Sequence, residues 1–85
     1  MHSLKKILGI NLRYYRNIEG LSQDNYYSKY HLSVKHMANV ERGCENVTLD
    51  FVDKISNSLN IKATDLLTFD ESKIINKRRV DQKTK

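Results

Sequence analysis

The sequence predicts a single small all-α domain, and three observations support this fold class. Proline is absent, and glycine occurs only at Gly9, Gly20 and Gly43. No stretch alternates apolar and polar residues for long enough to form a half-buried strand. The 85 residues, 39% of them hydrophobic, can build one compact core but not two. We therefore expect one bundle of short helices.

The first two helices are predicted from their apolar spacing and their end signals. The first spans residues 4 to 19, and Gly20 suits the left-handed residue that commonly follows a helix. Its apolar residues recur at steps of three and four, which places them on one face: Leu4, Leu8, Leu12, Tyr15 and Ile18. Ser22 can cap a second helix over residues 23 to 30, where Asp24 lies in the first turn and is favoured by the helix dipole.

The remaining helices have similar start signals. The segment LSVKHMANVERG, residues 32 to 43, predicts a third helix that begins after Ser33 and stops at Gly43. Thr48 can cap a fourth helix, whose apolar stripe is Leu49, Val52, Ile55 and Leu59. A short fifth helix begins near Thr64 and carries Leu66 and Leu67. Because the links are short, neighbouring helices should pack together.

The helical pattern weakens after Phe69, which divides a folded domain, residues 1 to 69, from a basic tail, residues 70 to 85. Ile74 and Ile75 either extend a short final helix or dock on a partner, and the polar chain from Lys77 onward is expected to be disordered. Six lysines and arginines against three acids give the tail +3 of the total +5, so the folded domain is only mildly basic. The charge and the pI of about 9.4 indicate an acidic partner, either nucleic acid or an anionic membrane surface.

Several classes of function are excluded by what the sequence lacks. The single Cys44 cannot form an intrachain disulfide, and no apolar run suits a signal peptide or a membrane span, so we expect a cytoplasmic protein without a membrane partner. The histidines have no partners at metal-ligand spacing, so we expect no metal. No nucleophile with its base, carboxylate pair or phosphate-binding glycine loop is present, so we expect no enzyme activity, cofactor or small-molecule ligand.

The third helix has a face that the core does not need. Winding it at about 100° per residue places Met37 and Val40 toward the core. The opposite side, with Val34 at its edge, carries Lys35, Ala38, Asn39 and Arg42. An asparagine amide matches the N6/N7 edge of adenine, lysine can donate to guanine O6/N7, and valine or alanine can touch a thymine methyl. An ordinary solvated face is the alternative. Two capped helices joined by a tight link nevertheless indicate a helix-turn-helix, whose second helix enters the major groove.

Two stretches, GLSQDNYYSKYHLSVKHMANVERG and ENVTLDFVDKISNSLNIKATDLL, resemble the Cro/CI-type helix-turn-helix family, also called the xenobiotic-response-element family. The resemblance covers about residues 8 to 67 and implies a compact five-helix lambda-repressor-like DNA-binding domain. It also implies roles for individual residues. Those expected to meet bases are Val34, Lys35, His36, Ala38 and Asn39. Those expected near the DNA backbone are Ser22, Gln23, Ser33, Arg42 and Asn46. Arg16 and Glu41 match a family pair that ties the first helix to the third, the alternative being two unrelated surface charges.

The tyrosines and His31 depart from the family pattern. The family prefers Leu-Ala where this chain has Tyr26-Tyr27, so Tyr27 should either point outward or push the helices apart. His31 stands in place of a glycine and should adopt the left-handed conformation with some strain. We expect Tyr15, Tyr26 and Tyr30 at the core or its rim, with Tyr27 or Tyr30 able to reach a phosphate. Stacking on single-stranded bases is the alternative.

The resemblance implies a sequence-specific regulator of transcription that binds double-stranded DNA as a homodimer on a palindromic operator and blocks or touches RNA polymerase. The expected dimer surface comprises Ile61, Leu66, Leu67 and Phe69, with Ile74 and Ile75 as further candidates. The ENVTLDFVDKI segment is similar to restriction-modification controller proteins. A phage or mobile-element repressor, or an antitoxin-type module that mainly holds a protein, are the alternatives. The expected setting is a prokaryotic or phage protein associated with the nucleoid.

Overall fold

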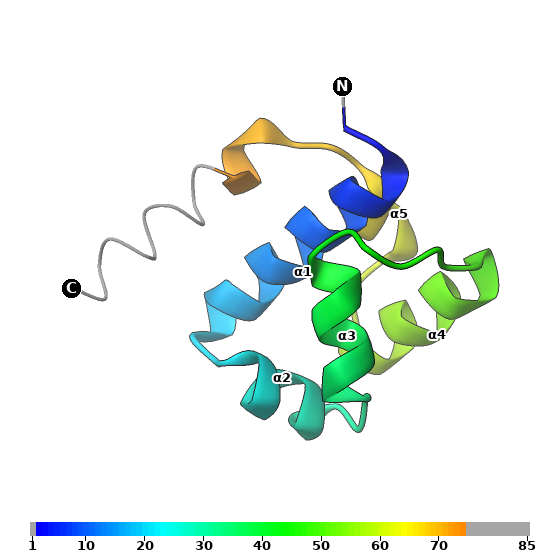
Figure 1. Cartoon of the computed structure of the whole chain (residues 1–85). Coiled ribbons are helices and arrows are strands. Elements are labelled where there is room, and N and C mark those ends of the chain that lie inside the picture. Colours follow the sequence, from blue (N-terminus) through cyan, green and yellow to red (C-terminus); the bar gives the residue numbers. More distant parts are fainter. Residues whose placement is uncertain (1, 75–85) are drawn as a thin grey trace.

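Figure 1 presents a computed structural model of the chain, which describes residues 2 to 74. Its helices are α1 (Leu4–Glu19), α2 (Gln23–Lys29), α3 (Val34–Glu41), α4 (Leu49–Leu59) and α5 (Ala63–Leu67). Residues 71 to 74 form one further helical turn, and the described part of the chain contains no strand. The predicted all-α class and its five-helix organisation are therefore confirmed. Ile75 and the predicted disordered stretch from Lys77 onward lie outside the described residues.

The helices begin and end at residues with suitable local chemistry. A hydroxyl accepts a hydrogen bond from the amide three residues later at the start of four helices: Ser3 for α1, Ser22 for α2, Ser33 for α3 and Thr48 for α4. Each bond satisfies an amide that has no partner within the helix. Gly20 ends α1 with a φ of 69°, and Asn60 ends α4 with a φ of 58°. His31 has a φ of 61°, so it takes the left-handed conformation expected where the family has glycine.

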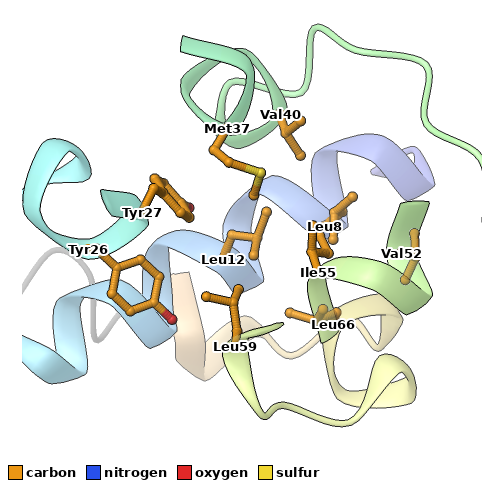
Figure 2. Packing of buried hydrophobic residues seen from close by; sticks show 10 residues of the cluster. All are labelled: Leu8, Leu12, Tyr26, Tyr27, Met37, Val40, Val52, Ile55, Leu59 and Leu66. Atoms are coloured by element: carbon orange, nitrogen blue, oxygen red, sulfur yellow. The ribbon is translucent and has the colours of Figure 1, made fainter. Parts of the chain in front are cut away.

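α1 is the central helix of the fold. It contacts α2, α3 and α5, while α2 also packs on α3 and α4 on α5 (Figure 1). Side chains from all of these helices meet in one core (Figure 2). The core residues are Leu8, Leu12, Tyr26, Tyr27, Met37, Val40, Val52, Ile55, Leu59 and Leu66. Burial of one such aliphatic side chain is worth about 1.5 to 3 kcal/mol, so this shared core accounts for the position of α3 against the rest of the domain.

The predicted apolar faces extend further than the core does. Leu4 and Ile18, in the first and last turns of α1, are 64% and 62% exposed, and Leu49, the first residue of α4, is 78% exposed. The spacing correctly places these residues on apolar faces, but these faces extend beyond the buried core. Leu4 and Leu49 line one surface hollow together with Leu8, Val52 and Leu67.

Gly9 sets how closely α1 and α3 approach. A Cβ atom built on Gly9 would lie far inside van der Waals contact of the Glu41 carbonyl oxygen and 2.9 Å from the Val40 carbonyl oxygen. Backbone therefore meets backbone at this crossing, and only a residue without a side chain fits. The carboxyl end of α3 lies against α1 for this reason.

Asn11 joins α1 to the end of α5. Its side chain is fully buried, and its Nδ2 donates to the carbonyl oxygens of Leu66, at 2.6 Å, and Thr68, at 3.0 Å. The helix end that precedes the tail is thereby tied to the central helix. Sequence reasoning missed this residue, although a polar side chain between Leu8 and Leu12 on the buried face of α1 was a usable signal.

Replacement of Asn11 by alanine is expected to lower the free energy of unfolding by about 2 kcal/mol, because the buried carbonyl group of Leu66 and the partly buried one of Thr68 lose their donor. Urea unfolding at a fixed protein concentration measures this loss. Asn17→Ala, in the same helix and half-buried, is the matched control, since its Nδ2 has no hydrogen-bond partner in the described structure. Equal losses in the two variants would contradict a special role for Asn11.

Candidate nucleic-acid interface

α2 and α3 form a helix-turn-helix with a short, well-bonded turn (Figure 1). The amide of His31 donates to the Ser28 carbonyl at 3.1 Å, and the amide of Leu32 donates to the Tyr27 carbonyl at 2.8 Å. The left-handed backbone at His31 turns the chain between these two bonds, and Ser33 then starts α3. The angle between the two helices is therefore set by backbone hydrogen bonds as well as by packing.

α3 divides its residues between the core and the surface. Met37 and Val40 are 1% and 2% exposed and point into the core (Figure 2). The surface side consists of the exposed Lys35, His36 and Arg42 and the half-buried Ala38 and Asn39. Val34 is half-buried and packs against the core, so only part of its side chain remains available on that surface. We call Lys35, Ala38, Asn39 and Arg42 the reading strip; within residues 2 to 74, its two cationic residues are exposed and the other two are half-buried.

The strip is held in place from the other side by Glu41. Its carboxylate is buried and accepts hydrogen bonds from Arg16 Nε at 2.8 Å and Nη2 at 3.1 Å, from Gln23 Nε2 at 3.0 Å and from the Tyr27 hydroxyl at 2.5 Å. Arg13 Nε lies 3.6 Å from the same carboxylate. One acid on α3 therefore binds donors from both α1 and α2, which fixes all three helices relative to one another.

The ionisation of this cluster follows from its surroundings. Burial alone would raise the pKa of the Glu41 carboxyl, but hydrogen bonds from Arg16, Tyr27 and Gln23 outweigh burial and lower the pKa below its ordinary value. Burial and the negative charge of Glu41 raise the pKa of Tyr27 far above its ordinary range, so the phenol stays protonated and donates. Burial opposes the charge on Arg16, yet Glu41 raises the pKa of Arg16. The cluster is therefore a buried carboxylate that is bonded to Arg16 and to two neutral donors, with Arg13 as a second, more distant cation.

Tyr27 neither points outward nor separates the helices. Its side chain is fully buried, its ring lies edge-on to that of Tyr26 at 5.0 Å, and its hydroxyl binds Glu41. The expectation that it would reach a phosphate or disturb the packing was wrong, because a buried acceptor satisfies the hydroxyl while the ring adds to the core. Tyr30 is half-buried, and its hydroxyl donates to Glu19 Oε2 at 2.8 Å.

The residues predicted to lie near the DNA backbone are found at the starts of α2 and α3, at the end of α3 and in the loop before α4. The hydroxyls of Ser22 and Ser33 cap α2 and α3, and these two helix starts leave amides that can bind phosphate. Asn46 is exposed, and its Oδ1 accepts from Lys5 Nζ at 3.0 Å. The Gln23 side chain is half-buried and turns toward Glu41, so part of its hydrogen-bonding capacity serves the fold.

Asn39 and its neighbours form a chain of side-chain hydrogen bonds on the strip. Arg42 Nη2 donates to Asn39 Oδ1, and Asn39 Nδ2 donates to Glu45 Oε2 at 3.3 Å. The other carboxylate oxygen of Glu45 lies 4.0 Å from His36 Nε2. Sequence reasoning did not single out Glu45, because its role depends on the turn at Gly43, which brings it back beside α3.

The four residues predicted for a dimer surface have different environments. Ile61 and Leu67 are half-buried, and Phe69 is 44% exposed. Leu66 is fully buried in the core of the monomer (Figure 2), so it cannot also contact a second subunit. The prediction for Leu66 was wrong because a five-residue helix turns one of its two adjacent leucines inward.

The described residues contain neither a candidate membrane span nor a candidate metal cluster. None of the helices described is long and apolar enough to cross a membrane. Residues 2 to 74 include no cluster of three or more histidine, cysteine, aspartate or glutamate side chains that could hold a metal ion. Cys44 is a free, exposed thiol.

Known proteins similar to this chain are regulators. No family model matches the chain. It is 38% identical over 65 residues to the control protein C.SmaI of Serratia marcescens, covering 76% of this chain and 77% of that protein. It is 30% identical over 69 residues to the control protein C.BamHI of Bacillus amyloliquefaciens, covering 80% and 85% of the two chains. The structure resembles that of a hypothetical transcription factor, NHTF, from Neisseria, with a TM-score of 0.71 and 26% identity over 85% of this chain and 83% of that one.

Proposed function

The chain belongs to the family of restriction-modification control proteins, DNA-binding regulators of transcription, and we propose that it acts as a homodimer on a palindromic operator. The operator would precede the genes of a restriction-modification system, in keeping with the relatives' description as control proteins. Occupancy of this site either blocks RNA polymerase or places the protein beside it. The relatives favour this function over a phage repressor or an antitoxin-type module.

The observation that carries the proposal is the two-sided construction of α3. Met37, Val40 and Glu41 hold the helix against α1 and α2, while Lys35 and Arg42 remain exposed. A short helix offered in this way suits the major groove, where base edges present distinct patterns of donors and acceptors. Lys35, Ala38 and Asn39, with His36 and the free part of Val34 at the margin, are the proposed base-reading residues.

Contacts to the phosphates would come from the rim of this surface. We assign them to the helix starts at Ser22 and Ser33, to Arg42, and to Asn46 in the loop before α4. Gln23 would contribute through whichever of its amide atoms the Glu41 bond leaves free. Such contacts fix the position of the protein on the duplex and carry little sequence information themselves.

Dimerisation would double a reading surface that is small in one subunit. A single eight-residue helix contacts few base pairs, and two-fold pairing places a second copy in the next major groove, about 34 Å away. Ile61, Leu67 and Phe69 are the proposed contacts, because each keeps apolar surface outside the core. Ile74, half-buried in the last described turn, lies close enough in sequence to extend this surface.

Selection of bound sequences from a pool of random duplexes tests the function directly. A two-fold symmetric consensus, together with a stoichiometry of two subunits per duplex, is the expected result. A consensus without symmetry would contradict the homodimer, and the absence of any consensus would contradict sequence-specific regulation. The selected sequences distinguish these two contrary outcomes, and a titration of the protein with the selected duplex gives the stoichiometry.

Asn39→Ala is expected to weaken binding to the selected operator by about 1 to 3 kcal/mol and to relax the preference at one base position, because a bidentate amide contact is lost. Titration of labelled operator and of single-base variants measures both effects. Asn57→Ala, at an exposed position of α4, makes the same chemical change away from the strip and should bind as the parent protein does. An equal loss for Asn39→Ala on unrelated duplexes would count against base reading.

A further inference from the structure

We propose that Glu45, together with Arg42, holds the Asn39 amide in one orientation and thereby sets the base preference at the operator position that Asn39 reads. Glu45 would then be a positioning residue for sequence recognition, although it is an acid on a surface that faces phosphates. This inference rests on the proposed function, because it assigns a task within the same reading strip.

The hydrogen bonds around Asn39 allow only one orientation of its amide group. A guanidinium can only donate, so Arg42 requires the carbonyl oxygen of Asn39 on its side. A carboxylate can only accept, so Glu45 requires the amide nitrogen of Asn39, which lies 3.3 Å away. Rotation of the amide by 180° would set oxygen against carboxylate and nitrogen against guanidinium. Both ends of the amide are therefore assigned by chemistry, independently of each other.

This orientation leaves the groups that adenine needs. An amide group has two N–H donors and two oxygen lone pairs, of which Glu45 and Arg42 each use one. One donor and one acceptor of Asn39 remain, which are the pair that bonds to N7 and N6 of adenine. An amide already fixed in the bound arrangement also loses less conformational freedom on binding than a freely rotating one. By holding the Asn39 amide in this orientation, Glu45 therefore favours adenine at the position that Asn39 reads.

The turn after α3 places Glu45 beside Asn39. Gly43, with a φ of 73°, reverses the chain after α3, and the Cys44 amide donates to the carbonyl oxygen of Asn39 at 3.1 Å. The turn is thus bonded to the residue that Glu45 contacts. On its other side the carboxylate lies 4.0 Å from His36 Nε2. Glu45 is half-buried among these groups, with Asn39 at one oxygen of its carboxylate and His36 beside the other.

The charge of Glu45 makes the proposal easy to separate from its alternative. A surface carboxylate that only faces DNA repels the phosphates, so its removal should strengthen binding to every duplex alike. A carboxylate that orients Asn39 acts in the opposite direction on the operator, because its removal should weaken discrimination between bases. A pure charge effect leaves the ratio of operator binding to single-base-variant binding unchanged, whereas loss of the orienting bond lowers this ratio.

The experiment uses the full chain and four variants: Glu45→Ala, Glu45→Gln, Asn39→Ala and the double variant Asn39→Ala/Glu45→Ala. Affinity is measured for the selected operator, for operators changed at the position that depends on Asn39, and for an unrelated duplex. Glu45→Ala is expected to lower the discrimination ratio about fivefold, since one orienting hydrogen bond is lost. Glu45→Gln keeps an acceptor without the charge and should preserve most of the ratio. In the Asn39→Ala background, Glu45→Ala should leave the ratio unchanged.

Asp53→Ala is the control for charge alone, because Asp53 is an exposed acid on α4 without a side-chain contact to the strip. A pure charge effect would raise the affinity of the Glu45→Ala variant equally for all three duplexes. This result would overturn the proposal. A ratio that falls equally in Glu45→Gln and Glu45→Ala would also overturn it, since the acceptor would then be irrelevant. If the parent chain shows no preference among duplexes, the proposed function itself fails. If it shows a preference that Asn39→Ala leaves intact, only the assignment of Asn39 and Glu45 fails.

Discussion

Glu41→Ala is expected to lower the free energy of unfolding by about 3 to 5 kcal/mol, one of the largest losses available from a single substitution in this chain. The reason is that Arg16 would keep its charge in a partly buried site without the carboxylate, while Gln23 and the Tyr27 hydroxyl would lose their shared acceptor. Urea unfolding followed by far-ultraviolet circular dichroism measures the loss. Operator affinity should fall with it, because α3 loses its link to α1 and α2.

Glu19→Ala provides the matched control for Glu41→Ala. Glu19 also makes an ion pair, with Lys29 at 2.9 Å, and accepts from the Tyr30 hydroxyl, but this pair lies at the surface. Water already solvates both of its charges, so a much smaller loss is expected. If the two variants were equally stable, the buried cluster would have no special part in holding the reading helix.

The same cluster makes the protein sensitive to acid. Because the hydrogen bonds outweigh burial, the folded-state pKa of Glu41 lies below its ordinary value of 4.5. The charged carboxylate therefore stabilises the fold fully above about pH 5, and this contribution is lost as the pH falls through the lower, folded-state pKa. We expect the unfolding free energy of the parent chain to fall more steeply between pH 5 and pH 3 than that of Glu41→Gln. Parallel curves for the two proteins would contradict this origin.

Gly9→Ala is expected to lower the free energy of unfolding by about 3 kcal/mol, because the added methyl group would collide with two backbone carbonyls of α3. The sign of this change in the free energy of unfolding distinguishes a collision from a simple gain in helix propensity. In an open helix the same change stabilises by about 1 kcal/mol, since alanine has the higher helix propensity. Thermal and urea unfolding of the variant measure the effect. Operator binding should fall further than stability alone requires, because the collision displaces the helix that carries the reading strip.

Gly20→Ala separates this collision from the general cost of replacing glycine. Gly20 has a φ of 69°, and no heavy atom lies within 4 Å of a Cβ built there. Its replacement should therefore cost only about 1 to 2 kcal/mol of backbone strain. A Gly9→Ala variant as stable as the parent chain would show that α1 and α3 can separate without loss, contrary to the packing described.

The helices could be predicted from the sequence because their signals are local. Serine or threonine before each of the first four helices, and apolar residues at steps of three and four, identify the ends and the inward faces. The separation of Met37 and Val40 from the opposite side of α3 follows from the same spacing. The resemblance to a helix-turn-helix family then added the arrangement of these helices, which the spacing alone does not contain.

The features that could not be predicted depend on residues far apart in the chain. Gly9 is constrained by carbonyl groups of α3, and Asn11 by those at the end of α5. The position of Asn11 on the apolar face of α1 marks it as unusual, but neither partner can be identified from the local sequence. The family preference for a small residue suggested that Tyr27 would disturb the packing. It does not, because its hydroxyl finds the Glu41 carboxylate. A large polar side chain is tolerated in the core only if a hydrogen-bond acceptor lies within its reach. The position of that acceptor depends on the folded chain and cannot be read from the local sequence.

The division of α3 into two sides has an evolutionary consequence. The side chains that anchor this helix, Met37, Val40 and Glu41, are different from those that it offers outward, Lys35, Ala38 and Asn39. Mutations can therefore accumulate at the outward positions without loosening the scaffold. A lineage built in this way can diverge toward a new target site while its architecture stays the same, and a laboratory library randomised at those three positions begins from an intact framework.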